Sequence, residues 1–170
     1  MIKRPGKDEY YLNIAKVVSN RSTCLKMLMG AIIVKEDQII ATGYVGSPRN
    51  TKSSIDHNFC LREKLNIPSG SKYELCRSIH AEQNAIINAA RAGVSLLGGD
   101  MYIYGESRKT KRTVNAFPCF ICKKMIINAG LNRIISSIEG KEKFKIFYVK
   151  EWVKEWKEND IIEDKYKYGQ

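Results

Sequence analysis

Two short stretches decide how this chain is interpreted: His80-Ala81-Glu82 and Pro118-Cys119-Phe120-Ile121-Cys122. Each is followed by a helix-forming run that ends in glycine. Pro118 suits entry into a helix, and cysteines in a first turn lie near the positive end of the helix dipole, which favours their thiolate form. The sequence therefore predicts two helices, at about 80–92 and 119–129, whose starts face each other.

The side chains of His80, Cys119 and Cys122 predict a metal centre. One imidazole nitrogen and two thiolates suit zinc, and three protein ligands leave a fourth position open for water, as in catalytic zinc sites. Zinc lowers the pKa of such a water from about 15.7 towards about 7. Glu82 lies two residues beyond the histidine, so on a helix its side chain points away from that ligand and is placed to carry protons.

This order and spacing resemble the H-x-E … P-C-x-x-C signature of zinc-dependent cytosine and adenine deaminases. The resemblance implies that His80, Cys119 and Cys122 hold a catalytic zinc ion and that Glu82 is the catalytic residue. The alternative is a lone histidine and two buried cysteines without metal. Order, spacing and helix placement all agree with the signature, which disfavours that alternative.

Length and composition predict one domain over residues 1–170. Hydrophobic residues make up 44% and charged residues 28%, which is ordinary for a soluble globular protein. No run of about 18 apolar residues predicts a membrane helix, and the first nine residues lack the apolar centre of a signal peptide. We therefore expect a cytoplasmic protein with no membrane partner, in which the five cysteines stay reduced and favour metal binding over disulfides.

The formal net charge of +11 allows two interpretations. A basic surface attracts polyanions, either nucleic acid or a phosphorylated small molecule. Alternatively, the lysines are simply solvated. The basic residues are spread along the chain and many alternate with Glu or Asp, which favours the second interpretation.

Hydrophobic periodicity predicts strands interleaved with helices. The order favours an α/β protein with a three-layer α/β/α fold, in which helices cover both faces of one mixed sheet of about five strands. Residues 46–78 are predicted as a long irregular segment, 107–115 as an exposed excursion, and 160–170 as a loose tail. The predicted helices are 8–20, 59–65, 80–92, 119–129 and 151–159, and the predicted strands are 28–35, 38–45, 101–104, 132–137 and 144–149.

Beyond the motif, the chain resembles deoxycytidylate (dCMP) deaminases over nearly its whole length to about residue 137. The resemblance implies the cytidine-deaminase-like fold, conversion of dCMP to dUMP and ammonia, and assembly into dimers or hexamers. It also implies that Gly30 and Ala31 line the base pocket with backbone groups. The stretches that carry it are 21–24, 29–34, 41–44, 60–70, 76–77 and 80–87.

The chain departs from that family where the sugar and phosphate are recognised. Val45 replaces an asparagine that usually contacts the sugar, and valine can neither donate nor accept a hydrogen bond. Apolar residues precede Gly30 where the family has polar and basic ones, which leaves Lys26 as the nearest cation. We expect a phosphorylated substrate held by Lys26, Arg49 or Arg77, with weak discrimination between sugars.

The remaining cysteines and histidine predict a second zinc ion. Cys24, His57, Cys60 and Cys76 make up the ligand count of a closed structural site. Such an ion would clip the 46–78 segment, and some dCMP deaminases that resemble this chain carry a second zinc in this region. The alternative is three buried thiols and a surface histidine.

The chain is also expected to form a homo-oligomer, because apolar side chains at Trp152, Val153 and Trp156 and the strand edge at 144–149 offer surface for an assembly to cover.

The sequence thus predicts a zinc-dependent hydrolytic deaminase of a pyrimidine nucleotide, most consistent with dCMP as substrate. One alternative is a deaminase of another cytosine-like or purine substrate, including an editor of tRNA or single-stranded nucleic acid. The basic run at 108–112 favours that alternative, whereas the scarcity of aromatic residues near the motifs, apart from Tyr44 and Phe117, disfavours it. A non-catalytic nucleotide-binding protein is a further alternative, and the intact Glu82 argues against it.

Overall fold

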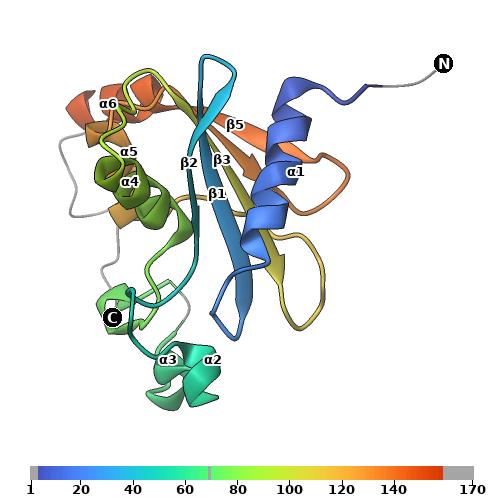
Figure 1. Cartoon of the computed structure of the whole chain (residues 1–170), viewed down its shortest axis with the longest axis vertical. Coiled ribbons are helices and arrows are strands. Elements are labelled where there is room, and N and C mark those ends of the chain that lie inside the picture. The colour runs from blue at the N-terminus through green and yellow to red at the C-terminus, as the bar shows by residue number, and fades with distance from the viewer. Residues whose placement is uncertain (1–3, 69, 159–170) are drawn as a thin grey trace.

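The computed structural model describes residues 4–68 and 70–158. Five strands form one mixed sheet (Figure 1), and their order is β2-β1-β3-β4-β5. Only the β3–β4 pair is parallel among the described strands, and the other neighbours are antiparallel. The strands are β1 Met27–Lys35, β2 Gln38–Tyr44, β3 Asp100–Ser107, β4 Arg133–Ser137 and β5 Phe144–Tyr148. The helices are α1 Lys7–Ser19, α2 Ser54–His57, α3 Leu61–Lys64, α4 Ala81–Arg91, α5 Phe120–Asn128 and α6 Val149–Glu158, with a 3₁₀ turn at Tyr73–Leu75.

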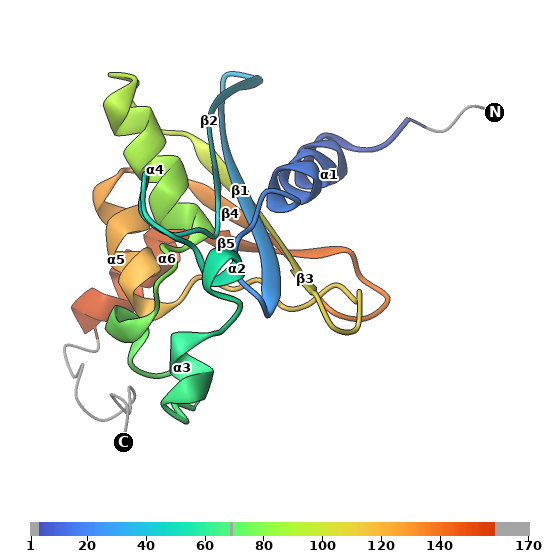
Figure 2. The ribbon, with the colours of Figure 1, turned by 60° about the horizontal axis from the view of Figure 1, so that its bottom comes forward.

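Helices cover both faces of this sheet, which confirms the predicted three-layer α/β/α architecture. Helix α1 lies on one face, and α4 and α5 lie on the other (Figures 1 and 2). Alternation along β1 sends Ile33 into the core beneath α4 and α5 and Ile32 into the core beneath α1. Both side chains are fully buried, so the sheet is sandwiched between two apolar layers.

A tight hairpin joins β1 to β2 and returns the chain to its starting end. Glu36 and Asp37 have φ values of 50° and 66°, as the central residues of a type I′ turn require. At the open end, the Thr23 N–H donates to the Val45 carbonyl at 3.0 Å. The segment that follows Val45 therefore leaves the sheet beside Cys24.

Helix α4 lies directly against β2 because Gly43 has no side chain. A Cβ at Gly43 would lie 2.3 Å from the Ala85 nitrogen, so any larger residue would displace the helix. The Asn84 and Asn88 side chains donate to the backbone oxygens of Tyr44 and Thr42 at 2.8 and 2.7 Å. These contacts fix the start of α4 beside the open end of the hairpin.

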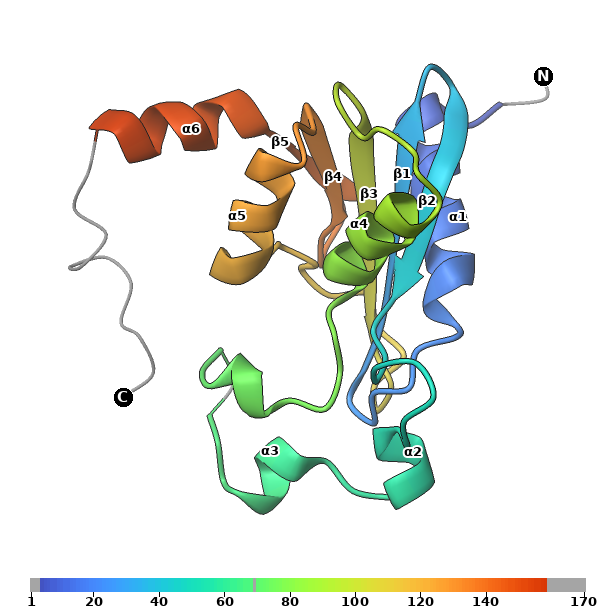
Figure 3. The same ribbon diagram turned by 60° about the vertical axis from the view of Figure 1, so that its left-hand side comes forward.

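Two elements differ from the sequence expectation. Strand β3 is longer than the predicted 101–104, because it pairs with β1 from Asp100 to Ser107 and so shortens the polar excursion. Helix α2 was not predicted, although its Ser53 and Asp56 form a capping box. Helices α2 and α3 lie beyond the end of the sheet (Figure 3), and the predicted tail at 160–170 lies outside the described residues.

The start of helix α6 packs within its own chain, against α5 and β5, which differs from the expected uncovered surface. Trp152 is only 7% exposed and belongs to the core shared with α4 and α5. The Trp156 ring lies 5.3 Å from the ring of Phe120. Trp152 therefore gives no support to an assembly, and the oligomer stays a prediction.

In the part of the chain that the structure describes, no helix has the length and apolar character needed to cross a membrane.

Candidate metal centre

The starts of α4 and α5 present three ligand side chains to one another. His80 is the N-cap residue of α4 and has extended backbone angles, and the Gln83 side chain accepts its N–H at 3.0 Å. Cys119 is the N-cap residue of α5, directly after Pro118, and Cys122 lies in the first turn. The three ligands therefore lie at two helix starts, as the sequence predicted, and these helix starts fix their positions.

The distances within this group fit a zinc ion. The His80 Nδ1 atom lies 3.5 Å from Cys119 Sγ and 3.4 Å from Cys122 Sγ. Nitrogen and sulfur ligands of a tetrahedral zinc are about 3.5 Å apart, given bond lengths of about 2.0–2.1 and 2.3 Å. Within the described residues, these three form the only group of three or more His, Cys, Asp or Glu ligand atoms lying within 4.8 Å of one another.

The pKa values of the two cysteine thiols are shifted in opposite directions. A hydrogen bond from Cys122 lowers the pKa of the Cys119 thiol to about 4. The same hydrogen bond, together with burial, raises the pKa of Cys122 above its ordinary value. The pair thus favours a thiolate at Cys119, the form that binds zinc.

Glu82 occupies the first turn of α4 and is 3% exposed. Burial raises the pKa of its carboxyl group above the ordinary value. The side chain lines the same cavity as His80 and Cys119. A carboxyl group that is not part of the ligand group but lies beside it has the position of a proton carrier.

The metal centre opens into a cavity of about 390 Å³, within the range of small-molecule sites of about 300–1,000 Å³. Apolar groups and a few polar side chains line it. Phe117 stands at its edge, 45% exposed. The cavity walls are Cys24, Lys26, Met27, Met29, Val45, Cys60, Arg62, Ile67, Tyr73, Cys76, Ser78, His80, Ala81, Glu82, Val114, Asn115, Phe117 and Cys119.

Residues 5–138 match the family described as "Cytidine and deoxycytidylate deaminase zinc-binding region". The chain belongs to this family. One of its relatives is the deoxycytidylate deaminase of Mycobacterium phage D29. The two sequences are 30% identical over 139 residues, which cover 79% of this chain and 96% of the phage protein. The deoxycytidylate deaminase of Saccharomyces cerevisiae is 30% identical over 148 residues, covering 85% of this chain but 43% of that protein.

Solved structures agree with this family membership. The crystal structure of dCMP deaminase from cyanophage S-TIM5 in complex with dCMP and dUMP is 27% identical, with a TM-score of 0.56. The match covers 79% of this chain and 83% of the phage protein. The chain spans less than half the length of the deoxycytidylate deaminases it matches from two yeasts, Saccharomyces cerevisiae and Schizosaccharomyces pombe, at 43% and 37%.

The residues predicted to contact substrate divide into two groups in the structure. Val45 and Lys26 line the cavity. Gly30 and Ala31 are not among the lining residues: a Cβ at Gly30 would meet the Ala15 oxygen of α1 at 2.2 Å, and Ala31 is fully buried in the core. Backbone contacts from Gly30 and Ala31 to a base stay a prediction.

The four residues predicted for a second zinc are only partly brought together. Cys24, Cys60 and Cys76 line the cavity, whereas His57 does not. His57 ends α2, with its ring 5.5 Å from that of Phe59 and its Nε2 atom buried without a hydrogen-bond partner among the described residues. In the described residues these four do not form a group with metal-binding spacing.

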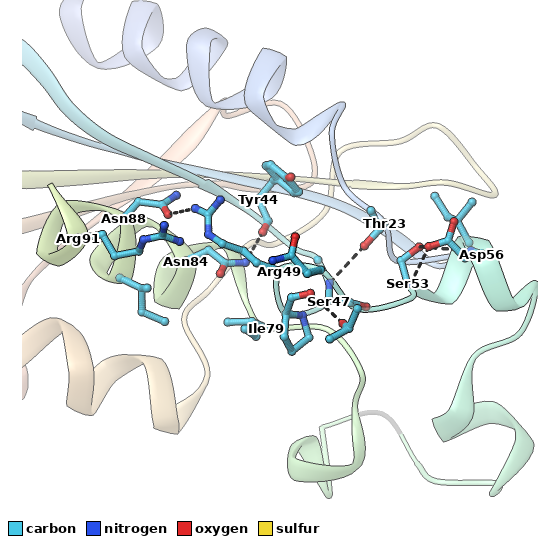
Figure 4. A pocket seen from close by; sticks show the side chains of 16 residues that line it. Thr23, Tyr44, Ser47, Arg49, Ser53, Asp56, Ile79, Asn84, Asn88 and Arg91 are labelled. Atoms are coloured by element: carbon cyan, nitrogen blue, oxygen red, sulfur yellow. Dashed lines mark hydrogen bonds between the residues drawn. The ribbon is translucent and has the colours of Figure 1, made fainter.

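Two of the cations predicted to hold a phosphate lie outside the cavity. Arg49 lines a separate cavity of about 640 Å³ with Asn84, Asn88 and Arg91, and its Nη2 donates to Asn88 Oδ1 at 2.6 Å (Figure 4). Arg77 donates to the Lys52 backbone oxygen at 3.4 Å.

Sequence reasoning missed two cavity residues, Arg62 and Tyr73. The Tyr73 ring meets the His80 ring edge-on at 4.9 Å, and the Arg62 Cζ atom lies 4.8 Å from the Tyr73 ring centre. The sequence signals were that Arg62 follows Cys60 closely and lies within the 60–70 stretch that resembles dCMP deaminases. Its approach to the metal centre depends on how the 46–78 segment folds.

Proposed function

We propose that this chain is a zinc-dependent hydrolytic deaminase that converts dCMP and water to dUMP and ammonia. The observation that carries the proposal is the convergence of His80, Cys119 and Cys122 beside the buried Glu82 in one cavity. Three ligands of this type hold a zinc ion while leaving room for water. The same four side chains satisfy the deaminase signature.

Each residue has a defined role in this reaction. His80, Cys119 and Cys122 would hold the zinc ion, which supplies an activated water when bound. Glu82 takes one proton from the attacking water and delivers it to N3 of the cytosine ring, and then moves the second proton from the new C4 hydroxyl to the leaving amino group. A C4–O bond forms and the C4–N bond breaks, so that ammonia leaves and the uracil carbonyl remains.

A nucleotide substrate is supported by the names of the relatives and by the cations of the cavity, Lys26 and Arg62. The test is a panel of dCMP, CMP, deoxycytidine, cytidine, dCTP, guanine and tRNA, assayed for ammonia and for the deaminated product. We expect the highest kcat/KM with dCMP. Ammonia released only from tRNA or guanine would assign the chain to another deaminase activity, and no ammonia from any compound would refute the proposal.

We further propose a second, structural zinc ion bound by Cys24, His57, Cys60 and Cys76. Three of these residues line one cavity, and the buried Nε2 of His57 has no partner in the described residues. Binding would require the His57 imidazole to move towards the three thiols, because it does not line their cavity in this structure. The ion would fix the 46–78 segment within a single deaminase domain of residues 1–170.

We also propose that the deaminase is a cytoplasmic homo-oligomer, a dimer or a hexamer. Support comes from β5, an edge strand of the sheet that pairs only with β4 among the described strands. Light scattering at micromolar protein should give a multiple of the 19.4 kDa chain mass. A mass of one chain would refute the assembly and leave the deaminase proposal untouched.

A further inference from the structure

Helix α3 carries a cation into the wall of the catalytic cavity. Arg62 lies on this short helix, within the 46–78 segment, and lines the cavity with His80 and Glu82. We propose that Arg62 binds the 5′-phosphate of the nucleotide substrate and thereby selects nucleotides over nucleosides. This inference rests on the proposed deaminase function and adds a specificity residue to it.

The guanidinium group of Arg62 is held in place by its own segment. Its Nη2 atom donates to the backbone oxygens of Pro68 and Ser71 at 2.5 and 2.7 Å, and its Cζ atom lies over the Tyr73 ring. A guanidinium fixed in this way loses little conformational entropy when it binds an anion. Planar N–H groups that remain available suit the several oxygens of a phosphate.

The charge distribution favours Arg62 over the other cation of the cavity. The Lys26 ammonium already pairs with the Glu63 carboxylate at 2.9 Å. Among the described residues, no carboxylate lies within ion-pair distance of Arg62. Its Nε atom is buried without a hydrogen-bond partner, which leaves donor capacity for a ligand.

Arg62 lies close to the metal centre along the cavity wall. Tyr73 contacts both the His80 ring and the Arg62 guanidinium, so the metal centre and the cation are one aromatic ring apart. Among the described residues that line the cavity, Glu82 is the one acidic residue, and it lies beside the metal ligands. In the proposed binding mode, the base of a nucleoside monophosphate lies at His80 and its phosphate at Arg62.

Arg77 provides a matched control. It lies in the same segment, its Nη2 donates to a backbone oxygen, and its Nε is buried without a partner among the described residues. Arg77 does not line the cavity. Replacing Arg77 therefore shows how much activity is lost when the segment loses a hydrogen-bonded arginine that does not contact the phosphate.

The experiment compares Arg62→Gln, Arg62→Lys and Arg77→Gln in the zinc-loaded protein. The measurements are kcat and KM for dCMP and for deoxycytidine, and the affinities for dUMP and deoxyuridine by calorimetry. We expect Arg62→Gln to lower kcat/KM for dCMP by about ten- to a hundredfold, mainly through KM, because a hydrogen-bonded charge is lost. Activity on deoxycytidine should change less than about threefold, and Arg62→Lys should fall in between because it keeps the charge but loses the planar fork.

The outcomes separate this inference from the proposed function. Equal losses on nucleotide and nucleoside in both Arg62 variants would show a structural role and overturn the inference. A nucleotide-specific loss in Lys26→Met but not in Arg62→Gln would place the phosphate elsewhere and overturn it as well. Absence of deamination by the wild type refutes the proposed function instead, and the dUMP affinities still test Arg62 because binding needs no turnover.

Discussion

The metal centre and the 46–78 segment lie side by side, yet the chain builds them in different ways. The ligands of the metal centre stand on the first turns of α4 and α5, and Cys122 is fully buried in the main core. Between Ser47 and Arg77, by contrast, the described residues include only two buried ones, Ser53 and Ser54. The metal centre is held by apolar packing, whereas the segment contains no apolar core of its own.

This difference indicates what each region requires. Ligands on packed helices are positioned before any ion binds, so their geometry already fits zinc. The segment consists of short helices and turns whose ordering entropy is not offset by buried apolar surface. It needs a metal ion, a ligand or a partner chain to become rigid.

Glu82→Gln should abolish most activity while leaving the metal centre intact. Glutamine keeps the shape of the buried side chain but cannot carry protons, and loss of a general acid–base residue costs at least about 10²- to 10⁴-fold in kcat. Zinc content and melting temperature should stay close to those of the wild type. Steady-state kinetics with dCMP and metal analysis provide the measurements.

Glu155→Gln on the exposed side of α6 is the matched control and should behave like the wild type. Turnover by Glu82→Gln within tenfold of the wild type would exclude the assigned role.

Metal analysis should give about two zinc ions per chain, and Cys60→Ser and Cys122→Ser should each remove about one. Structural zinc contributes folding free energy, so Cys60→Ser should also expose the 46–78 segment to protease and lower the melting temperature. Cys122→Ser should abolish activity while the segment stays resistant. The comparison of the two variants distinguishes a structural zinc ion, which orders the 46–78 segment, from a zinc ion bound by ligands that the packing of α4 and α5 already positions.

A wild type that binds one zinc ion, unchanged in Cys60→Ser, would eliminate the second site. Protease resistance of the segment would then have to come from substrate or from a partner chain.

Val45→Asn should sharpen the preference for dCMP over CMP by about two- to tenfold. Asparagine restores a hydrogen-bonding group in the cavity, and one neutral hydrogen bond contributes about 0.5–1.5 kcal/mol. The ratio of kcat/KM values for the two nucleotides measures the effect. Val45→Ile, which stays apolar, should leave the ratio unchanged, and the same shift in both variants would mean that cavity shape rather than hydrogen bonding is responsible.

The same contrast explains what the sequence could predict. The ligand positions of His80, Cys119 and Cys122 follow from helix-start signals and local spacing, and hydrophobic periodicity located each of the long elements. The place of Arg62 in the cavity could not be predicted, because it depends on contacts with Tyr73 and with backbone oxygens in an irregular segment. Arg49 and Arg77 were expected near the phosphate from their distance along the chain, but neither lines the cavity: Arg49 faces a separate cavity, and the Arg77 guanidinium donates to the Lys52 backbone oxygen.

Helix α6 shows a second limit of sequence reasoning. Its apolar side chains predicted exposed surface, but periodicity alone does not say whether an amphipathic helix covers its own sheet or a partner. Here Trp152 is buried against α5 in the same chain.

Product analysis in oxygen-18 water distinguishes hydrolysis at the metal centre from any other source of product. Zinc-loaded protein is incubated with dCMP, and the products are followed by mass spectrometry and an ammonia assay. We expect one ammonia for each dUMP and one oxygen-18 atom at C4 of the product, with no product from Cys122→Ser. Failure to form dUMP, or equal formation by Cys122→Ser, would contradict hydrolysis at the centre formed by His80, Cys119 and Cys122.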